Sequence, residues 1–300
     1  ADLYGAMDAA EVKADFARAS TEAKRIQARY QGKIASLGAD GRALAEAIQA
    51  YEALSDLMGR LGSYAGLLYA DPARAKFYGD TSEQLTNISA DLIFFELEFN
   101  QIDDAALAQA LKVPALARYK PWLDDLRKEK PHQLAEALEK LFHDKGQTSR
   151  GAFNRLFDET MTGLRFKVDG HAEPLALEPT LNLLTSADRA KRQAGAEALG
   201  VTFKDNIRLF TLITNTLAKD KEISDRWRGF QDVADARHLS NKVEGPVVEA
   251  LVSAVRAAHP RLSHRYYAMK AKWLGLERLA SWDRNAPLPE KPARVVPWGE

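Results

Sequence analysis

The chain has 300 residues, of which 46% are hydrophobic and 28% charged, a composition that is ordinary for a globular protein and excludes disorder along its whole length. Its 42 Lys and Arg residues balance 42 Asp and Glu residues, and this neutrality argues against a dedicated nucleic-acid-binding protein and against a polybasic membrane-surface protein. The sequence contains no cysteine, which excludes disulfides, a thiol nucleophile and cysteine-ligated metal. No apolar run reaches the roughly 18 residues of a membrane span, and the N-terminus lacks the pattern of a signal peptide. We therefore expect a soluble, cytoplasmic protein.

The N-terminal part of the chain shows the spacing of amphipathic helices. Apolar or small side chains recur every three or four positions from Val12 to Ile34 and again from Leu44 to Leu68, which keeps one helix face turned toward a core. A third helix is predicted over residues 80–99. Because its residues 92–95 are apolar on several sides, this helix should be central and buried. Long helices with short polar connections predict an all-α fold, a multi-helix antiparallel bundle.

One segment carries a β signal. Residues 164–168 alternate apolar and polar, Asp169 and Gly170 form a turn dipeptide, and residues 174–177 can return along the first strand. These features predict one small β-hairpin near residues 164–177. We place a domain boundary after it, with an N-terminal helical domain over residues 1–185 and a second region over residues 186–300.

Helical spacing resumes after this boundary. The helix predicted from Pro246 onward should bury Val247, Leu251 and Val255 on its inner face. Further helices are predicted over residues 201–221 and 260–275.

The segment over residues 264–273 interleaves basic and aromatic residues, a pattern that can bind single-stranded nucleic acid. On a helix, however, Tyr266, Met269 or Lys270, and Trp273 share a face, and the neutral charge of the chain favours core packing for that face. The sequence after Ala286 is rich in proline and has no closing helix or strand. We therefore expect the chain to be part of a larger protein.

Sequence motifs for common catalytic chemistries are missing. Helical zinc peptidases place two His residues four positions apart with a Glu between them, and no such HExxH motif occurs. His259 and His264 are five positions apart, which on an α-helix turns them about 140° from each other. His171 and Glu173 match half of the zinc-deaminase signature, but the cysteines that would complete it are absent. Neither GxSxG nor a Gly-rich phosphate loop occurs, so residue patterns by themselves assign no catalytic and no metal-binding residue.

A series of short motifs nevertheless resembles one known family. Residues 131–145, 155–159 and 164–166 occur in the order found in the N-terminal region of oligoendopeptidase F and its relatives, the bacterial branch of the thimet-oligopeptidase-like zinc metallopeptidases. Further matching motifs lie at residues 203–206, 215–221, 241–251, 264–266, 274–276 and 282–283. The resemblance covers most of the chain, residues 80–300, and it rests on the order and spacing of motifs that are individually modest.

The resemblance implies a mostly helical, zincin-like peptidase architecture that encloses a deep channel. In this family the cofactor Zn²⁺ sits on an HExxH helix with a further Glu ligand, and the Glu of HExxH polarises the water that attacks the scissile carbonyl. Family chains are longer, and their HExxH lies beyond the last residue of this sequence, so the architecture would be cut before its metal-binding helix. Residues 186–300 would then be the opening helices of an incomplete peptidase domain, and no zinc ligand or catalytic residue can be carried over.

We therefore predict that the parent protein is a metalloendopeptidase that uses zinc to hydrolyse internal bonds of short peptides, and that these 300 residues are inactive alone. The implied partners are short peptide substrates, with no nucleic acid and no membrane. Candidate substrate-binding residues are Arg237, His238 and Asn241, in a predicted loop that precedes a helix and gathers hydrogen-bond donors. The alternative for Asn241 is that it caps the next helix. The alternative function is a non-catalytic helical peptide-binding or scaffolding protein.

Overall fold

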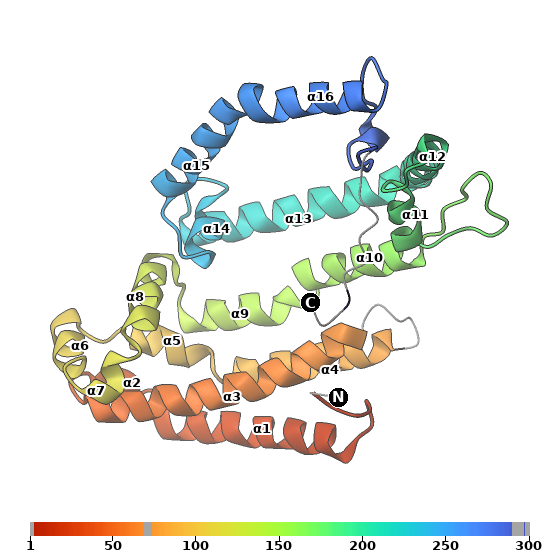
Figure 1. Cartoon of the computed structure of the whole chain (residues 1–300). Coiled ribbons are helices and arrows are strands. Elements are labelled where there is room, and N and C mark those ends of the chain that lie inside the picture. The colour runs from red at the N-terminus through yellow and green to blue at the C-terminus, as the bar shows by residue number, and fades with distance from the viewer. Residues whose placement is uncertain (1–2, 69–73, 290–296, 298–300) are drawn as a thin grey trace. The chain divides into compact units, whose positions relative to one another are not determined.

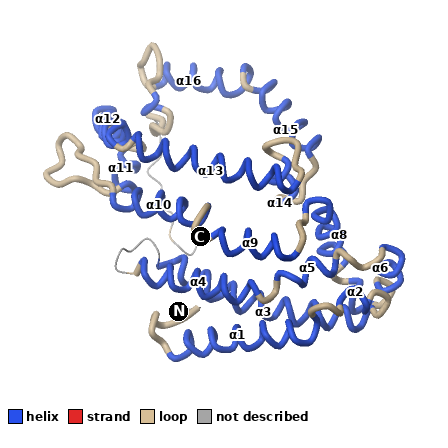
Figure 2. The backbone as a smooth tube through the Cα atoms, turned by 180° about the vertical axis from the view of Figure 1, so that it is seen from behind, coloured by secondary structure: helices blue, strands red, loops and turns tan. Residues whose placement is uncertain are grey.

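The structure is a computed structural model that describes residues 3–68, 74–289 and 297. Helices make up nearly all of the regular structure in these residues, as Figures 1 and 2 show, so the predicted all-α class is confirmed in its main feature. The chain divides into two compact units. The first unit consists of residues 1–155 and 216–242, and the second of residues 156–215 and 243–300. Within the described ranges, no helix is long and apolar enough to cross a membrane.

The first unit is built from long N-terminal helices and a set of shorter ones. Its complete helices are α1 (Ala10–Tyr30), α2 (Ile34–Leu37), α3 (Gly41–Leu68), α4 (Ala75–Ala90), α5 (Ile93–Phe99), α6 (Asp104–Ala110), α7 (Pro114–Ala117), α8 (Lys120–Glu129), the 3₁₀ turn η1 (Lys130–His132), α9 (Glu136–Gly146) and α14 (Asp235–Ser240). Two further helices, α10 (Arg150–Gly163) and α13 (Ile207–Arg228), each contribute one end to this unit and the other end to the second.

The core of the first unit forms where the sequence periodicity predicts it. Along α1, the side chains of Val12, Ile26 and Tyr30 are buried, and so are Leu44 and Leu54 on α3. Helix α1 packs on α3, and α3 packs on α4; Figure 1 shows the three helices side by side in red and orange. Burial of each large apolar side chain stabilises the fold by about 1.5–3 kcal/mol before the entropy of ordering it is subtracted. The amphipathic helices predicted in this part of the chain are therefore confirmed.

The helix predicted over residues 80–99 is wrong as a single element, because the chain forms α4 and α5 with a break at Asp91 and Leu92. At the break the N–H groups of these two residues bond to carbonyl oxygens three residues back, at 3.3 and 2.9 Å, which ends α4 in a tight turn. The break reorients the apolar run so that Leu92, Phe94 and Phe95 are all buried. On one continuous helix these three side chains would point in widely different directions. The prediction that this run is central and buried is confirmed.

The second unit has a smaller apolar core, centred on α12. Besides the ends of α10 and α13 it contains α11 (Leu177–Leu183), α12 (Arg189–Asp205), α15 (Gly245–Ala258), the π-helical turn η2 (Pro260–His264), α16 (Arg265–Trp273) and the 3₁₀ turn η3 (Ser281–Asp283). Phe166 and Val168, in the segment between α10 and α11, are buried against Ala198 and Leu199. The ring of Phe166 also meets Phe203 edge-on, with 5.6 Å between ring centroids.

The predicted β-hairpin near residues 164–177 is wrong, because only one residue pair forms a bridge. Phe166 and Leu175 exchange two antiparallel hydrogen bonds, of 2.8 and 2.9 Å. On one side the ladder cannot continue, because the N–H of Leu164 is already bonded to the carbonyl oxygen of Thr160 at the end of α10, at 3.1 Å. On the other side the carbonyl oxygen of Val168 accepts a turn hydrogen bond. The backbone N–H and carbonyl groups that two longer strands would pair with each other are thus already hydrogen-bonded within the flanking helix and the turn.

A buried ionic interaction holds η3 against α12. Asp283 is fully buried and accepts hydrogen bonds from Arg189 at 3.1 Å, from Arg192 at 2.9 Å and from the N–H of Ala280 at 2.9 Å. Burial alone would raise the pKa of Asp283, but these hydrogen bonds and the charge of Arg189 together outweigh it and lower the pKa. The second unit therefore relies on a paired buried charge as well as on its small apolar core.

The inner faces predicted for α15 and α16 are wrong, because their large apolar side chains are exposed. Val247, Leu251 and Val255 are 55, 63 and 47% exposed, and Tyr266 and Trp273 are 43 and 46% exposed. The buried residues of α16 are instead Lys270 and Ala271. Amphipathic spacing identifies a helix face that is able to pack against another segment. No segment within the described residues covers the apolar faces of α15 and α16.

Candidate functional site

The predicted substrate-binding residues lie on and just after α14, a short helix where the sequence predicted a loop. The start of this helix is stabilised by Asp235, whose carboxylate accepts the N–H groups of Asp232 and Gln231 at 2.8 and 3.2 Å. These hydrogen bonds, the one from Asp232 foremost, lower the pKa of Asp235. Arg237 and His238 follow in the last turn, where positive charge lies favourably beside the free helix carbonyls.

The structure brings the three candidate residues onto one side of α14. Asn241 closes the helix, with its N–H bonded to the carbonyl oxygen of Arg237 at 2.9 Å. Asn241 therefore stands four residues from Arg237 and three from His238, the two spacings at which helical side chains are neighbours. Its alternative role as cap of the next helix is wrong, because the N-cap residue of α15 is Glu244. In the part of the chain that the structure describes, no hydrogen bond or salt bridge engages these three side chains.

Lys242 fixes the end of α14 within the first unit. Its φ angle of 56° is left-handed, a backbone conformation that costs a non-glycine residue roughly 1–2 kcal/mol. Its ammonium group pairs with the carboxylate of Asp125 on α8 at 3.2 Å. Hydrogen bonds from Lys242 and, second, from Lys128 lower the pKa of Asp125. Because the Lys242 side chain is 60% exposed, the ion pair offsets only part of this cost directly after the candidate residues.

A second ion pair ties the end of α13, just before α14, to α9. Arg228 donates two parallel hydrogen bonds to Glu139, at 2.8 and 2.7 Å. The bond to Glu139 raises the pKa of Arg228; burial would raise the pKa of Glu139, but its bonds to Arg228 and to the N–H of Leu134 lower it. His132 adds a contact between its Nδ1 and the carbonyl oxygen of Arg228 at 2.8 Å and stacks on Phe230, with 3.9 Å between ring centroids. No sequence pattern indicated these pairs, because their members lie 89 or more residues apart.

The face of α14 carries hydrogen-bond donors. Guanidinium, imidazole and carboxamide groups donate hydrogen bonds to carbonyl and carboxylate oxygens, which are the polar groups that every peptide presents. Nucleophilic catalysis needs in addition an activated nucleophile, for example a hydroxyl group bonded to a free base. The hydroxyl of Ser240 on α14 instead donates to the carbonyl oxygen of Arg237, at 3.1 Å. The geometry of α14 therefore supplies hydrogen-bond donors and no activated nucleophile.

One Ser–His contact elsewhere in the first unit is structural. His143 Nε2 lies 3.0 Å from the hydroxyl oxygen of Ser89 and 3.0 Å from the carbonyl oxygen of Thr86. Ser89 itself donates to the same carbonyl oxygen, at 3.0 Å. Because that oxygen can only accept, the imidazole nitrogen carries the hydrogen, so it cannot take a proton from Ser89.

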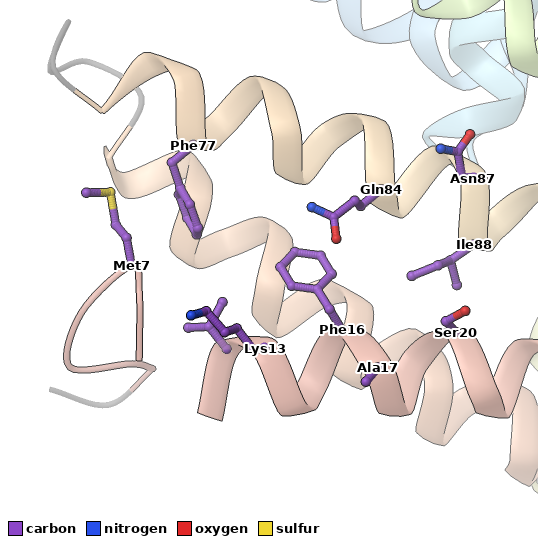
Figure 3. Close-up of a pocket in the computed structure, with 10 residues that line it drawn as sticks. Met7, Lys13, Phe16, Ala17, Ser20, Phe77, Gln84, Asn87 and Ile88 are labelled. Atoms are coloured by element: carbon purple, nitrogen blue, oxygen red, sulfur yellow. The ribbon is translucent and has the colours of Figure 1, made fainter. Parts of the chain in front are cut away.

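A hollow of about 560 Å³ opens in the first unit between α1 and α4 (Figure 3). Phe16 and Phe77 turn toward it from the two helices, and the side chains of Lys13, Gln84 and Asn87 lie along its polar edge. Among the described residues that line it, none carries a carboxylate or an imidazole. These residues therefore form neither an acid–base pair nor a metal-ligand set.

The described residues do not fit a catalytic zinc ion. Such a site needs three protein ligands around one open position, and within residues 3–68, 74–289 and 297 no three His, Asp or Glu side chains gather in that way. His132 and His143 are each held by a carbonyl oxygen, as described above.

The sequence is similar to that of known oligopeptidases. The family described as Oligopeptidase F matches residues 98–166. Oligopeptidase PepF of Bacillus subtilis is 25% identical over 282 residues, which is 91% of this chain and 41% of that protein. Group B oligopeptidase PepB of Streptococcus agalactiae is 23% identical over 71% of this chain and 36% of its own length. The chain thus spans less than half the length of these relatives.

The fold is similar to that of solved peptidase structures. The crystal structure of oligoendopeptidase-F from Enterococcus faecium matches with a TM-score of 0.80 at 22% identity, over 92% of this chain and 56% of that one. The crystal structure of a "putative peptidase" from Chlamydophila abortus matches with a TM-score of 0.60 at 17% identity, over 84% of this chain and 43% of that one. In sequence and in fold, the chain resembles the N-terminal half of the oligoendopeptidase F family.

Proposed function

We propose that the chain is the N-terminal helical part of an oligopeptidase that hydrolyses internal bonds of short peptides with the help of Zn²⁺. The observation that carries this proposal is the similarity to oligopeptidase PepF over 91% of the chain. It is supported by the fold shared with an oligoendopeptidase-F structure. Residues 1–185 would form the N-terminal domain, and residues 186–300 the first helices of the peptidase domain. We further propose that this enzyme acts in the cytoplasm and binds neither nucleic acid nor membrane.

The exposed apolar face of α15 supports the proposal that this chain belongs to a longer protein. Val247, Leu251 and Val255 recur every four residues and are about half exposed or more. Large contiguous apolar surfaces in water usually mark places where another polypeptide segment packs. The relatives contain more than half of their length beyond the part that this chain matches. We assign to that additional part the role of covering α15 and of supplying the HExxH motif, which these 300 residues lack.

Within this proposal, Arg237, His238 and Asn241 bind the peptide substrate. Their shared face on α14 offers donors to the carbonyl oxygens or the carboxylate of a peptide. In the natural, catalytically active protein, Arg237→Ala should raise KM for short peptides at least about tenfold, because a hydrogen bond from a charged donor contributes about 1.5–3 kcal/mol. Measured kcat should change little. Arg42→Ala, an exposed arginine on α3, is the matched control and should leave KM unchanged. An unchanged KM in Arg237→Ala would remove this face from the substrate site.

The enzyme assignment is tested by the mass and zinc content of the natural gene product. We expect a mass well above 33.3 kDa, about one bound zinc per chain, and cleavage of quenched fluorescent peptides that a chelator abolishes. These 300 residues expressed alone should show no hydrolysis. A natural product of 33.3 kDa that binds peptides without zinc and without cleaving them would instead establish the alternative, a non-catalytic peptide-binding or scaffolding protein.

A further inference from the structure

The junction between α15 and α16 is a π-helical turn, η2 (Figure 1, in blue). The N–H of His264 bonds to the carbonyl oxygen of His259, five residues back, at 3.0 Å. Pro260 stands at the start of the turn and has no N–H to continue the α-helical ladder. Single π turns inside helices recur at functional sites, because the wider turn redirects side chains. The side chains redirected here belong to two histidines.

The π turn places His259 and His264 side by side. Their ring centroids are 6.2 Å apart and their planes are inclined by 40°. The sequence-based expectation that the two residues diverge by about 140° is wrong, because it assumed α-helical winding. A hydrogen bond over five residues closes one full turn, so residues five apart come to the same side of the helix. Both residues are exposed, and no hydrogen bond or salt bridge in the described part of the chain engages either imidazole.

The separation of the two rings suits a shared metal ion. An imidazole nitrogen lies about 2.0–2.1 Å from a bound Zn²⁺, and the ring centre is roughly 1.1 Å farther, so two rings on one ion have centroids at most about 6.4 Å apart. The observed 6.2 Å lies inside this limit. A tetrahedral angle at the metal would bring the centroids to about 5 Å. Rotation about the side-chain bonds of two exposed residues can supply a closing movement of about 1 Å.

The surroundings select the kind of ion. The neighbours of the pair on η2 and at the start of α16 include Arg261 and Arg265, and among the described residues no carboxylate or further histidine joins the pair. Ca²⁺ and Mg²⁺ require oxygen ligands, so this environment excludes them. Late first-row divalent ions bind imidazole nitrogen strongly, in the order Cu²⁺ above Ni²⁺ and Zn²⁺. Nearby positive charge weakens binding of any cation, which sets the expected affinity at a moderate level.

We propose that His259 and His264 form a two-imidazole site that binds one late first-row divalent metal ion, with water completing its coordination. The site is built by the π turn and lies apart from any HExxH motif, which the sequence lacks. Both ligands belong to one helical segment, so the pair itself is complete in this chain. His259 continues the four-residue spacing of Val247, Leu251 and Val255, so access of the ion in the longer enzyme depends on how far the additional part covers α15. Bound metal would bridge the end of α15 to the start of α16 and stabilise the turn.

The proposal is tested by titrating the 300-residue chain, without any polyhistidine tag, with Cu²⁺, Ni²⁺ and Zn²⁺ in an isothermal calorimeter. We expect one equivalent to bind, Cu²⁺ most tightly, and Mg²⁺ not to bind. His259→Gln and His264→Gln should each weaken binding at least tenfold. His171→Gln, which removes an exposed histidine from the loop between α10 and α11, is the matched control and should bind like the unchanged chain.

A second measurement distinguishes one metal ion bound by both histidines from ions bound separately by each histidine. The electron paramagnetic resonance spectrum of one equivalent of Cu²⁺ should show two imidazole nitrogens, and one in either single variant. Circular dichroism checks that both variants keep the helical fold, as expected for exposed side chains. Equal affinity in all variants, or a spectrum with one nitrogen in the unchanged chain, would overturn the proposal. Neither result would bear on the peptidase assignment, which is tested by mass and hydrolysis.

Discussion

At the scale of single residues, buried charges decide how stability responds to pH. At Asp283 a fully buried carboxylate stands between Arg189 and Arg192, and Arg192 is itself buried. At Glu96 on α5, burial and, second, the charge of Glu129 raise the pKa. The partners of Asp283 favour its ionised form, whereas the surroundings of Glu96 disfavour its ionised form. Substitutions that remove the charge at these two positions should therefore change the free energy of unfolding in opposite directions.

Asp283→Asn should lower the free energy of unfolding by about 3 kcal/mol at neutral pH, because it leaves a buried guanidinium without its counter-charge. The pKa of Asp283 is lowered in the folded state, so its contribution is present above the unfolded-state pKa and is lost as pH falls through the folded-state value. The difference between the two proteins should therefore shrink in acid. Urea unfolding followed by circular dichroism from neutral to acidic pH measures this. Asp169→Asn, in the exposed loop, is the control, and an equal loss there would contradict the argument.

Glu96→Gln should raise the free energy of unfolding at neutral pH, by about 1 kcal/mol, a common size for single substitutions. The folded-state pKa of Glu96 is raised, so the ionised side chain carries a penalty above that pKa, and the penalty disappears as pH falls through it. The amide oxygen can still accept the hydrogen bond from the Tyr51 hydroxyl, which is 3.3 Å long. Thermal unfolding at several pH values should show the gain at neutral pH and its disappearance in mild acid. A gain that is independent of pH would point to a cause other than ionisation.

At the scale of helices, packing of the backbone decides where a helix tolerates a side chain. Helix α3 contains two glycines in opposite settings. A Cβ added at Gly41 would collide with the carbonyl oxygen of Ala110 and come within 2.8 Å of the Cβ of Val113, whereas one at Gly59 would meet nothing within 4 Å. The close approach of α3 to the chain at the end of α6 thus depends on the absence of a side chain at Gly41.

Gly41→Ala should therefore lower stability by about 1–3 kcal/mol, the usual cost of overpacking. Gly59→Ala should instead raise stability by about 0.5–1 kcal/mol, because alanine restricts the unfolded chain and favours the helix. The two variants are matched in helix and in chemical change, so a comparison of their urea midpoints isolates the effect of the contact. Equal midpoints would show that α3 can move away from Ala110 at little cost.

At the scale of the whole molecule, the two units differ in how much apolar surface they cover. The first unit has a large core built on α1, α3 and α5, whereas the second has a small core on α12 and leaves α15 uncovered within the described residues. A helix with no buried side chain receives little stabilisation from tertiary contacts. The contribution of α15 to stability should therefore depend on what packs against it.

Leu251→Gln tests this dependence in two settings. In the 300-residue chain the substitution should change stability by less than about 0.5 kcal/mol, because the side chain is 63% exposed. In the longer natural protein of the proposed function, the same substitution should cost about 2 kcal/mol or more, as for a leucine in a core. Thermal unfolding of both proteins with and without the substitution supplies the comparison. A small effect in both settings would show that the added part packs elsewhere.

Much of the candidate site could not have been predicted from the sequence. The spacing of Arg237, His238 and Asn241 can be read from the sequence. Their placement on a helix face depends on Asp235, whose carboxylate accepts two backbone N–H groups at the start of α14. This hydrogen-bond pattern has no strong sequence signature. The pairs Arg228–Glu139 and Lys242–Asp125 join residues that are far apart in sequence. One signal was available in advance at the π turn, since Pro260 interrupts the ladder of hydrogen bonds between two histidines.

The sequence by itself determined the helical class, the buried faces of α1 and α3, and the family resemblance, because helical periodicity and motif order are properties of neighbouring residues along the chain. Only the tertiary structure decided that residues 80–99 form two helices, that one bridge replaces the hairpin, and that α15 is uncovered. It also decided that His259 and His264 lie side by side. The physical reason is common to these cases. A periodic pattern shows that a face can be buried, whereas burial, helix breaks and unusual turns depend on which distant groups compete for the same hydrogen bonds and the same space.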